Sequence, residues 1–507
     1  MINNDIKFCK IKNNSSISLN SIPVLPYSEF CDFVVELLCL EENHCVNYFA
    51  YKFENGYNFI IAIANDLNSD IYVFSHQIKN GEELKLKSLS PQIIALHIFE
   101  REIFESYGID FEGHQWLKPV RYPFDRADKK QVINNYPFYQ IKSYELHEVG
   151  VGPIHAGVIE PGHFRFICNG EDVLHLEIQL GWQHRGIEKL MLQKNNLLQR
   201  TILSESIAGD TAVAHSLAFA QLIETLASIE VSDQLKIERS LALELERIAV
   251  HTADIAALCT DVAYNLGANI FGILRTGIIN YTQLWCGCRL GKSMIRVGGI
   301  NLPFTKELSE NLLKVIKKYE FQFNELAHHT YKMASIENRF DYIGTVSKSQ
   351  MWQIGAVGMA ARVANLKRDI RWSHKFAGFE KYPIEPVFLP NGDVFARFLL
   401  RRKEIKSSIA WIKNMLSFEK FENPSEKPVK NVKMKANSFA ISLAEGWRGE
   451  ICHCAITDSE GEIIFYKIKD PSLHNWKALE LSLRNLEISD FPINNKSYNL
   501  SYCGFDL

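Results

Sequence analysis

The chain has 507 residues, enough for two or three domains with a sizeable core. Its formal net charge of -3 argues against a nucleic-acid-binding surface, so we expect no nucleic-acid partner. No apolar run approaches the roughly 18 residues that a membrane span requires, and the first residues lack the basic and apolar regions of a signal peptide. We therefore expect a cytoplasmic protein that reaches a membrane only through partner subunits.

The first unit, residues 1–124, is predicted to be a small α+β domain. Its predicted helices cover Asp32–Leu40 and Pro91–Tyr107, and Gly108 stands in a C-cap position after the second. Short apolar runs rich in β-formers, separated by Asn and Asp, predict strands at Tyr57–Ala64 and Ile71–Phe74.

Residues 125–143 are polar and are predicted to be a linker, and residues 144–507 form the second unit. This unit opens with strand-like alternation from Val158 through Ile178. It is then mostly helical, and strands return between Ser438 and Ile468. The predicted helices are 215–229, 235–259, 305–333, 349–369 and 393–416. The expected fold is an α+β N-terminal domain followed by a mainly α-helical large domain with an opening antiparallel β-hairpin and C-terminal strands.

The 11 cysteines include no Cys-x-x-Cys motif, which predicts reduced and mostly buried thiols. Cys286/Cys288 and Cys452/Cys454 form two Cys-x-Cys pairs, the second enclosing His453. Because that second pair lies in a strand-like segment, both sulfurs should face one side as small apolar groups. Neither pair has a second pair at ligand spacing, so we expect no metal on this chain.

The segment from Glu205 to Ser216 reads Glu-Ser-Ile-Ala-Gly-Asp-Thr-Ala-Val-Ala-His-Ser. It resembles the segment of membrane-bound [NiFe]-hydrogenase large subunits that reads Glu-Arg-x-Cys-Gly-x-Cys-x-x-Ala-His-Ser. The frame agrees at Glu205, Gly209, Ala214, His215 and Ser216. Ala208 and Thr211 replace the two cysteines that would bind nickel.

Other segments follow the same resemblance in chain order. Phe99–His114 resembles the signature of the small peripheral-arm subunit of respiratory complex I, which is fused onto many hydrogenase large subunits. The later segments resemble hydrogenase and complex I large subunits, and they are Gly152–Phe166, His184–Leu190, Leu245–His251, Arg296–Ile300 and Gly392–Arg397. Together they resemble the energy-converting hydrogenase and complex I superfamily, in the hydrogenase-related type that lacks nickel ligands.

The second cysteine pair of that family lies close to the C-terminus, in an Asp-Pro-Cys-x-x-Cys-x-Asp-Arg string. Aligned on Asp506, these cysteines fall on Ser501 and Gly504. We call Ala208, Thr211, Ser501 and Gly504 the cysteine-equivalent positions. A [NiFe] centre needs four soft thiolates, so we expect no nickel here.

In complex I, the cavity that corresponds to the [NiFe] site of the hydrogenases binds quinone. The resemblance implies a headgroup contact from a tyrosine just after the first cysteine position, where this chain has Gly209. It implies a second contact from a histidine in the opening hairpin, where His155 and His163 are both candidates. The acid nearest to Ala208 is Asp210.

Two groups of charged residues add candidates. Glu244, Arg247 and His251 share one helix face, which is either a solvated stripe or a polar line into the cavity that relays protons. Asp369 and Arg371 stand at a helix end, where they are either structural or, by the resemblance, line the cavity. We expect Glu188, Arg247, His251 and Asp369 to converge in one cleft near Ser501. The candidate catalytic residues are His155, His163, Glu188, Asp210, His215, Arg247, His251, Asp369 and Arg371.

The sequence has no Gly-x-Gly-x-x-Gly after a strand and no phosphate-binding loop, so NAD is expected elsewhere in the complex. Iron–sulfur clusters lack their cysteines here and are expected on a small partner subunit. One function is the large subunit of a complex I-like or hydrogenase-4-like oxidoreductase, active only within the complex. It would pass electrons to quinone or a related acceptor, coupled to ion translocation. The alternative is a non-catalytic docking subunit that joins an electron-transfer partner to membrane ion-pump subunits. Both place the chain peripherally on the cytoplasmic side of the inner membrane.

Overall fold

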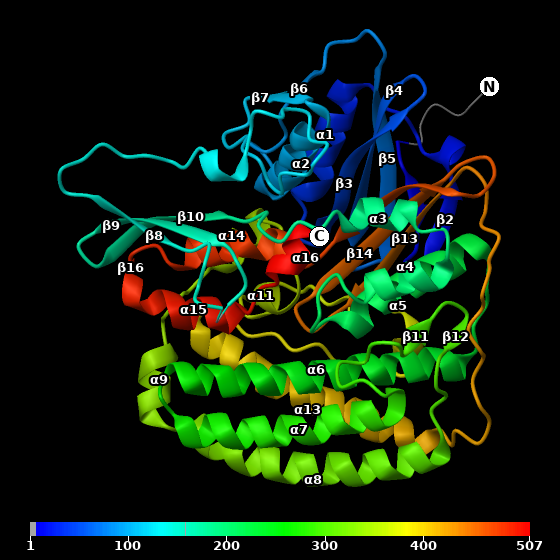
Figure 1. Ribbon diagram of the computed structural model, residues 1–507, viewed down its shortest axis with the longest axis vertical. Helices are drawn as coiled ribbons and strands as arrows, with labels where there is room; N and C mark the ends of the chain where they lie inside the picture. Colours follow the sequence, from blue (N-terminus) through cyan, green and yellow to red (C-terminus); the bar gives the residue numbers. More distant parts are fainter. Residues whose placement is uncertain (1–6, 158) are drawn as a thin grey trace.

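The computed structural model describes residues 7–157 and 159–507. Its N-terminal part is an antiparallel sheet in the order β1-β5-β4-β3, accompanied by α1 and α2 (Figure 1). The bounds are β1 Cys9–Ile11, β3 Asn43–Phe53, β4 Gly56–Asn65, β5 Asp70–Lys79, α1 Tyr27–Leu38 and α2 His97–Tyr107. Gly108 ends α2 in the left-handed region at φ 70°, and its N–H donates to the Phe104 carbonyl, as the sequence predicts. A short parallel pair, β6 Lys85–Lys87 and β7 Asp110–Glu112, completes this part.

The second unit opens with the predicted antiparallel hairpin. It belongs to a sheet in the order β16-β10-β9-β8. The strands are β8 His147–Val151, β9 His163–Asn169, β10 Asp172–Gln179 and β16 Leu486–Glu487. Val158, where the predicted alternation begins, lies outside the described residues.

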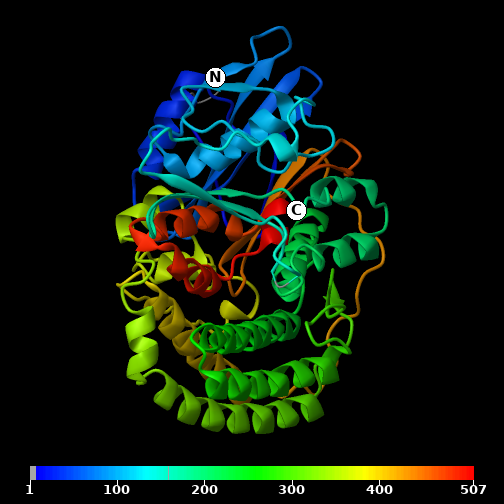
Figure 2. The ribbon, with the colours of Figure 1, turned by 60° about the vertical axis from the view of Figure 1, so that its left-hand side comes forward.

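Four long helices, α6, α7, α8 and α13, lie together at the end of the molecule opposite the first sheet (Figures 1 and 2). They span α6 Asp233–Asp261, α7 Asn265–Cys286, α8 Lys306–Thr330 and α13 Val394–Phe418. The shorter helices are α3 Ile187–Gln193, α4 Leu197–Ser204, α5 Ala212–Ala227, α9 Ala334–Phe340, α14 Ser472–Ser482, α15 Phe491–Tyr498 and α16 Tyr502–Asp506. Within the described ranges, no helix is both long and apolar enough to cross a membrane.

The single helix predicted over 349–369 is wrong. The chain forms two short helices there, α10 Lys348–Gln353 and α11 Gly358–Arg362, and a third, α12 Ile370–Ser373, follows the predicted range. The break has a steric cause, because Gly358 adopts φ 62° and a Cβ there would lie 2.1 Å from the Cα of Gly449.

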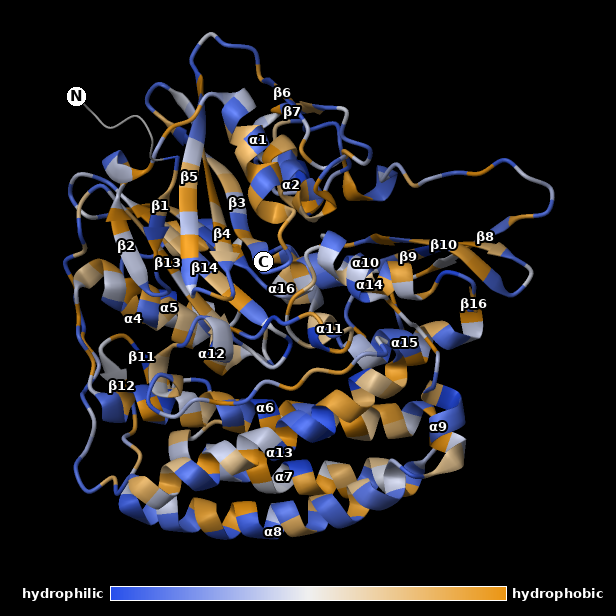
Figure 3. Ribbon diagram, turned by 180° about the vertical axis from the view of Figure 1, so that it is seen from behind, coloured by the Kyte–Doolittle hydropathy of each residue, from blue (hydrophilic) through white to orange (hydrophobic). Residues whose placement is uncertain are grey.

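The third sheet joins the two ends of the chain in the order β15-β14-β13-β2. Its strands are β2 Ser15–Ser18, β13 Ser438–Glu445, β14 Glu450–Thr457 and β15 Ile463–Lys469. Helix α5 packs on β13 and β14, and buried apolar residues from this sheet, the first sheet and the long helices form one core. Figure 3 shows these inner strands as largely hydrophobic, whereas α8 alternates hydrophilic and hydrophobic residues. The predicted fold class is thus confirmed.

Candidate functional site

Arg448, in the turn between β13 and β14, joins the loop before α5 to the C-terminal segment. Its two terminal nitrogens each lie 2.7 Å from a carboxylate oxygen of Asp210, and one also donates to Thr211 Oγ1 at 3.0 Å. Its Nε donates to the Asn499 carbonyl at 2.6 Å. The guanidinium therefore links the first pair of cysteine-equivalent positions to the chain that carries the second pair.

At the second pair of cysteine-equivalent positions, Ser501 and Gly504, contacts within the chain fill the space. Ser501 Oγ accepts the Gly504 N–H at 2.8 Å and caps α16. A Cβ at Gly504 would lie 2.6 Å from Asp470 Cγ, so the Asp470 carboxylate occupies the space that a cysteine side chain would need. Arg185 donates to the carbonyls of Ile207 and Cys503, which ties the two loops together.

These residues do not fit a nickel centre. The four cysteine-equivalent side chains offer a methyl group, two hydroxyls and a hydrogen, where nickel requires thiolates. The Arg448 guanidinium beside Thr211 adds a positive charge that would repel a metal cation. Within residues 7–157 and 159–507, no group of three or more His, Cys, Asp or Glu side chains is placed to hold a metal ion.

Next to this site lies a buried ionic network centred on α6. Arg247 donates to the carbonyls of Glu445 and Gly446 at 2.7 and 3.0 Å, and to Glu244 at 3.3 Å. His251 Nε2 lies 2.8 Å from Glu404 Oε2. Glu244, Arg247 and His251 are each 0% exposed, so they are not a solvated stripe.

The same network includes two further predicted residues, Asp369 at the N-cap of α12 and Arg371 within it. Arg371 pairs with Asp369 at 2.7 Å and with Glu244 at 3.1 Å. Arg362 pairs with Glu404 and Glu445, each at 2.6 Å. Arg247, His251, Asp369 and Arg371 are therefore brought together, through Glu244, which the sequence singled out, and through Glu404 and Glu445, which it did not.

The carboxylates of the network differ in how readily they hold a proton. Although burial opposes ionisation, the Arg362 charge and the His251 hydrogen bond keep the pKa of Glu404 well below its usual value. Burial raises the pKa of Glu445 to about 7 despite its pair with Arg362. Glu445 therefore holds a proton more readily than Glu404 does.

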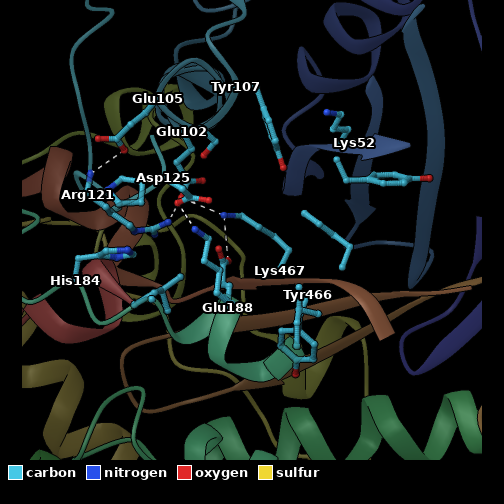
Figure 4. A pocket seen from close by; sticks show the side chains of 18 of the residues that line it. Lys52, Glu102, Glu105, Tyr107, Arg121, Asp125, His184, Glu188, Tyr466 and Lys467 are labelled. Atoms are coloured by element: carbon cyan, nitrogen blue, oxygen red, sulfur yellow. Dashed lines mark hydrogen bonds and ion pairs between the residues drawn. The ribbon is translucent and has the colours of Figure 1, made fainter. Parts of the chain in front are cut away.

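Glu188 does not join this network. The prediction that it converges with Arg247, His251 and Asp369 is therefore wrong for Glu188. Helix α3 packs on β15, where Glu188 accepts the Ile468 N–H at 2.9 Å and lies 3.2 Å from Lys467 Nζ. It lines a cavity of about 350 Å³ between the N-terminal and large domains. Figure 4 shows Lys467 reaching between Glu188 and Glu102 in this cavity.

The hairpin histidines bond to their own loop. His155 Nε2 lies 2.8 Å from the Gly162 carbonyl, and His163 Nδ1 lies 3.0 Å from the Gly152 carbonyl. At Gly209, where the resemblance implies a tyrosine, no atom lies within 4 Å of an ideal Cβ. The two quinone contacts of the complex I pattern are thus not reproduced by these residues.

His215 lies between two partners in a buried chain of hydrogen-bonded side chains. Its Nε2 is 3.1 Å from Asp470 Oδ2, and its Nδ1 is 3.1 Å from His453 Nε2. Sequence reasoning did not connect His453 with this site. A signal existed, since strand alternation at Cys452 and Cys454 directs His453 to the opposite face.

Sequence reasoning also missed Arg448, Asp470, Glu404 and Glu445. Only Arg448 had a local signal, because it stands between Gly446 and Gly449 in a turn that joins two apolar strands. Glu404 is one of several charges on a long helix, and nothing in its neighbourhood marks it as buried.

Models of two protein families match this chain. Residues 27–129 match the respiratory-chain NADH dehydrogenase 30 Kd subunit, and residues 269–437 match the 49 Kd subunit of the same enzyme. The chain therefore contains regions that match both complex I subunits, and its relatives include subunits of complex I and of membrane-bound hydrogenases. Both matched regions lie in one polypeptide.

Individual relatives agree with this assignment. Hydrogenase-4 component G of Escherichia coli (strain K12) is 26% identical over 433 residues, which cover 82% of this chain and 74% of that protein. The C/D subunit of NADH-quinone oxidoreductase from Bacteroides thetaiotaomicron is 25% identical over 451 residues, covering 82% and 83%. A protein of the membrane-bound sulfane sulfur reductase, an archaeal respiratory membrane complex, has the same fold. Its TM-score is 0.66 at 20% identity, covering 73% of this chain and 100% of that one.

Proposed function

We propose that this chain is the large peripheral subunit of a membrane-associated oxidoreductase complex whose cavity works without a [NiFe] centre. In this proposal, electrons arrive from a cluster-bearing small subunit and reduce quinone or a related acceptor. Membrane subunits couple this step to ion translocation. The chain would bind the membrane peripherally, on its cytoplasmic side, through these partners.

The buried ionic network carries the proposal. Removing charges from water costs several kcal/mol per ion, which their mutual attraction must offset, and Arg247, Arg362, Arg371, Glu244 and Glu404 are all at most 1% exposed. A pure docking subunit gains nothing from such an arrangement beside the cysteine-equivalent positions. A redox cavity does, because charge that develops on a reduced acceptor needs fixed positive groups and a proton source.

The acceptor is not fixed by the hairpin histidines or by Gly209. The similarity to a sulfane sulfur reductase makes a sulfur compound the related acceptor to test beside quinone. Arg448 would face either acceptor as the cation of the site, held in place by Asp210 and Asn499.

The test is purification of the complex through a tag on this chain, followed by assays with a soluble quinone and with polysulfide. Replacing Arg448 by Met should lower turnover on the order of 10²-fold while the complex still assembles. The control is Lys413→Met, which removes an exposed pair with Glu320 and should leave turnover unchanged. A complete complex that reduces neither acceptor would support the docking alternative.

A further inference from the structure

The cavity between the N-terminal and large domains is not used by the proposed function. Its volume of about 350 Å³ lies in the range of roughly 300–1,000 Å³ that small-molecule pockets occupy. Helix α2 lines one side of it, and α3 and β15 line the other (Figure 4). Its exposed lining residues are Lys52, Ser106, Asp125, Lys189 and Ile464. A small molecule can therefore enter this cavity from solution.

The charged end of the cavity holds a buried carboxylate oxygen without a partner. Glu102 is 8% exposed, and its Oε1 accepts hydrogen bonds from both Arg121 and Lys467. Its Oε2 is buried as well, and it has no hydrogen-bond partner among the described residues. A buried acceptor that stays unpaired is costly. A ligand that offers an N–H to Oε2 would remove this cost.

Lys467 supplies the complementary donor. An ammonium group has three N–H bonds, and Lys467 Nζ lies 3.1 Å from Glu102 Oε1 and 3.2 Å from Glu188 Oε1. Its third N–H has no acceptor in the part of the chain that the structure describes. Because Lys467 binds the other oxygen of the same carboxylate, an unpaired donor and an unpaired acceptor lie side by side at the cavity.

The charges around this pair favour a neutral ligand. Glu102 and Glu188 already balance Arg121 and Lys467. Burial lowers the pKa of Lys467 although Glu188 opposes the change, so these surroundings disfavour charge. A charged ligand would bring in a further charge without a partner, which is costly in a buried place. A neutral group that both donates and accepts meets neither penalty.

The rest of the cavity suits a flat ring. Its apolar and aromatic lining comes from Tyr51, Tyr107, Leu192 and Phe465. Figure 4 shows the Tyr107 ring standing over the cavity with its hydroxyl directed toward the middle. Aromatic side chains pack favourably against the faces and edges of planar rings. The lining thus adds a shape to the hydrogen-bonding pattern at Glu102.

We propose that this interdomain cavity binds a neutral heterocycle that carries an N–H beside a C=O. The N–H donates to Glu102 Oε2, and the C=O accepts from Lys467. The carboxamide of a nicotinamide ring and the imide edge of a flavin ring share this chemistry. The ligand would contact α2 of the N-terminal domain and β15 of the large domain, and would thereby join them. The site requires no electron transfer, so it is independent of the proposed function.

The first experiment measures binding to the purified complex with two pairs of probes. Nicotinamide is compared with 3-acetylpyridine by equilibrium dialysis, and lumiflavin with 3-methyllumiflavin by flavin fluorescence. The second member of each pair keeps the C=O and lacks the N–H, so it should bind at least about tenfold more weakly. Binding of one pair alone assigns the site to a single ring or to a flavin ring. The proposal is overturned if no probe binds, or if loss of the N–H changes nothing.

The second experiment reverses the hydrogen-bonding pattern. In Glu102→Gln, Arg121 and Lys467 keep the side-chain oxygen as their acceptor, so the new NH₂ group faces the cavity. This variant should prefer 3-acetylpyridine to nicotinamide by about tenfold, whereas structural damage would weaken both probes alike and would contradict the role of Glu102. The control is Glu100→Gln on the same helix, whose carboxylate accepts from Ser88 Oγ outside the cavity. It should keep the wild-type preference.

A third variant decides the matter should the Glu102→Gln complex fail to assemble. Ser106 is exposed and lines the cavity, so Ser106→Trp should leave the fold intact and fill the space with an indole ring. Binding of every probe should then be lost. Probes that bind Ser106→Trp as well as they bind the wild type lie elsewhere in the complex, and the proposal fails.

Discussion

Arg448 and Asp210 face each other as a two-pronged pair, with both nitrogen–oxygen distances at 2.7 Å, although 238 residues separate them in the chain. The pair stands where the resemblance places a metal. Parallel N–H···O bonds of this kind fix orientation as well as charge. The loop before α5 is therefore held by a side chain rather than by a coordination bond.

Arg448→Lys should loosen this loop, because an ammonium cannot reproduce the fork or the bond to Asn499. We expect faster hydrogen exchange in residues 205–212 of the assembled complex. The corresponding change Arg339→Lys affects a partly exposed pair with Asp490 and should cost about 0–1 kcal/mol. Equal exchange rates in the two variants would contradict the structural role of Arg448.

The purified complex should contain no stoichiometric nickel, because the cysteine-equivalent positions provide no thiolate. Iron should instead follow the amount of the cluster-bearing partner. Elemental analysis of the complex, normalised to this chain by quantitative amino-acid analysis, checks both statements. A value near one nickel per chain would refute the first.

Gly504→Ala should destabilise the C-terminal segment. Its Cβ would lie 2.6 Å from the Asp470 carboxylate, and crowding of this kind costs about 1–3 kcal/mol. Gly209→Ala is the matched control, since nothing lies within 4 Å of its Cβ. Hydrogen exchange in residues 499–507 should rise only in the first variant, and a rise in both would show that crowding at Asp470 is not the cause.

Arg247→Met should destabilise the large domain by about 3–5 kcal/mol, because it breaks a buried network and leaves the carbonyls of Glu445 and Gly446 without their donor. Lys413→Met, at an exposed pair, should cost about 0–1 kcal/mol. Exchange protection of α6 in the assembled complex measures the difference. Similar protection in both variants would mean that the network is not a source of stability.

Asp506 should make local stability depend on pH. Burial raises its pKa from 3.8 to about 6, although the N–H groups of Gly181 and Gln183 oppose this. The folded state then binds the proton more tightly than the unfolded state does. The stabilisation that comes from protonated Asp506 is therefore complete below pH 3.8. It falls as the pH rises to about 6 and stays constant above that value. The total loss is about 3 kcal/mol.

Asp506→Asn removes this titration. Exchange protection of residues 181–186, measured between pH 4 and pH 7 and corrected for intrinsic rates, should then become nearly independent of pH. If exchange protection in Asp506→Asn depends on pH as strongly as in the wild type, the titration belongs to another group.

Local patterns in the sequence predicted much of the fold. Strand alternation placed the sulfurs of Cys452 and Cys454 on one face, and they lie 3.5 Å apart. Helix α7 escaped prediction because it contains Gly267, Gly272 and Gly277, which lower helix propensity. Gly267 is required by packing, since a Cβ there would lie 2.3 Å from the Tyr264 ring.

The candidate site was predicted less completely, because its decisive contacts join distant segments. Motif resemblance located His215, Arg247 and Asp369, each from the residues around it. The partner of His215, Asp470, is 255 residues away, and it has no motif of its own. Pairings of this kind depend on how the third sheet packs on α5, which no window of sequence contains.

Strand β2 lies near the beginning of the chain and pairs with β13, so that Ser18 faces Ser438 and Ser15 faces Ile441. Asn13 adds side-chain bonds to the backbone of Leu443 and His374. An expression design that starts the polypeptide at the large domain would thus expose the edge of β13 to aggregation. Two fragments divided in the linker should instead recover the fold when produced together, and a peptide carrying residues 7–26 is the natural supplement for a truncated form.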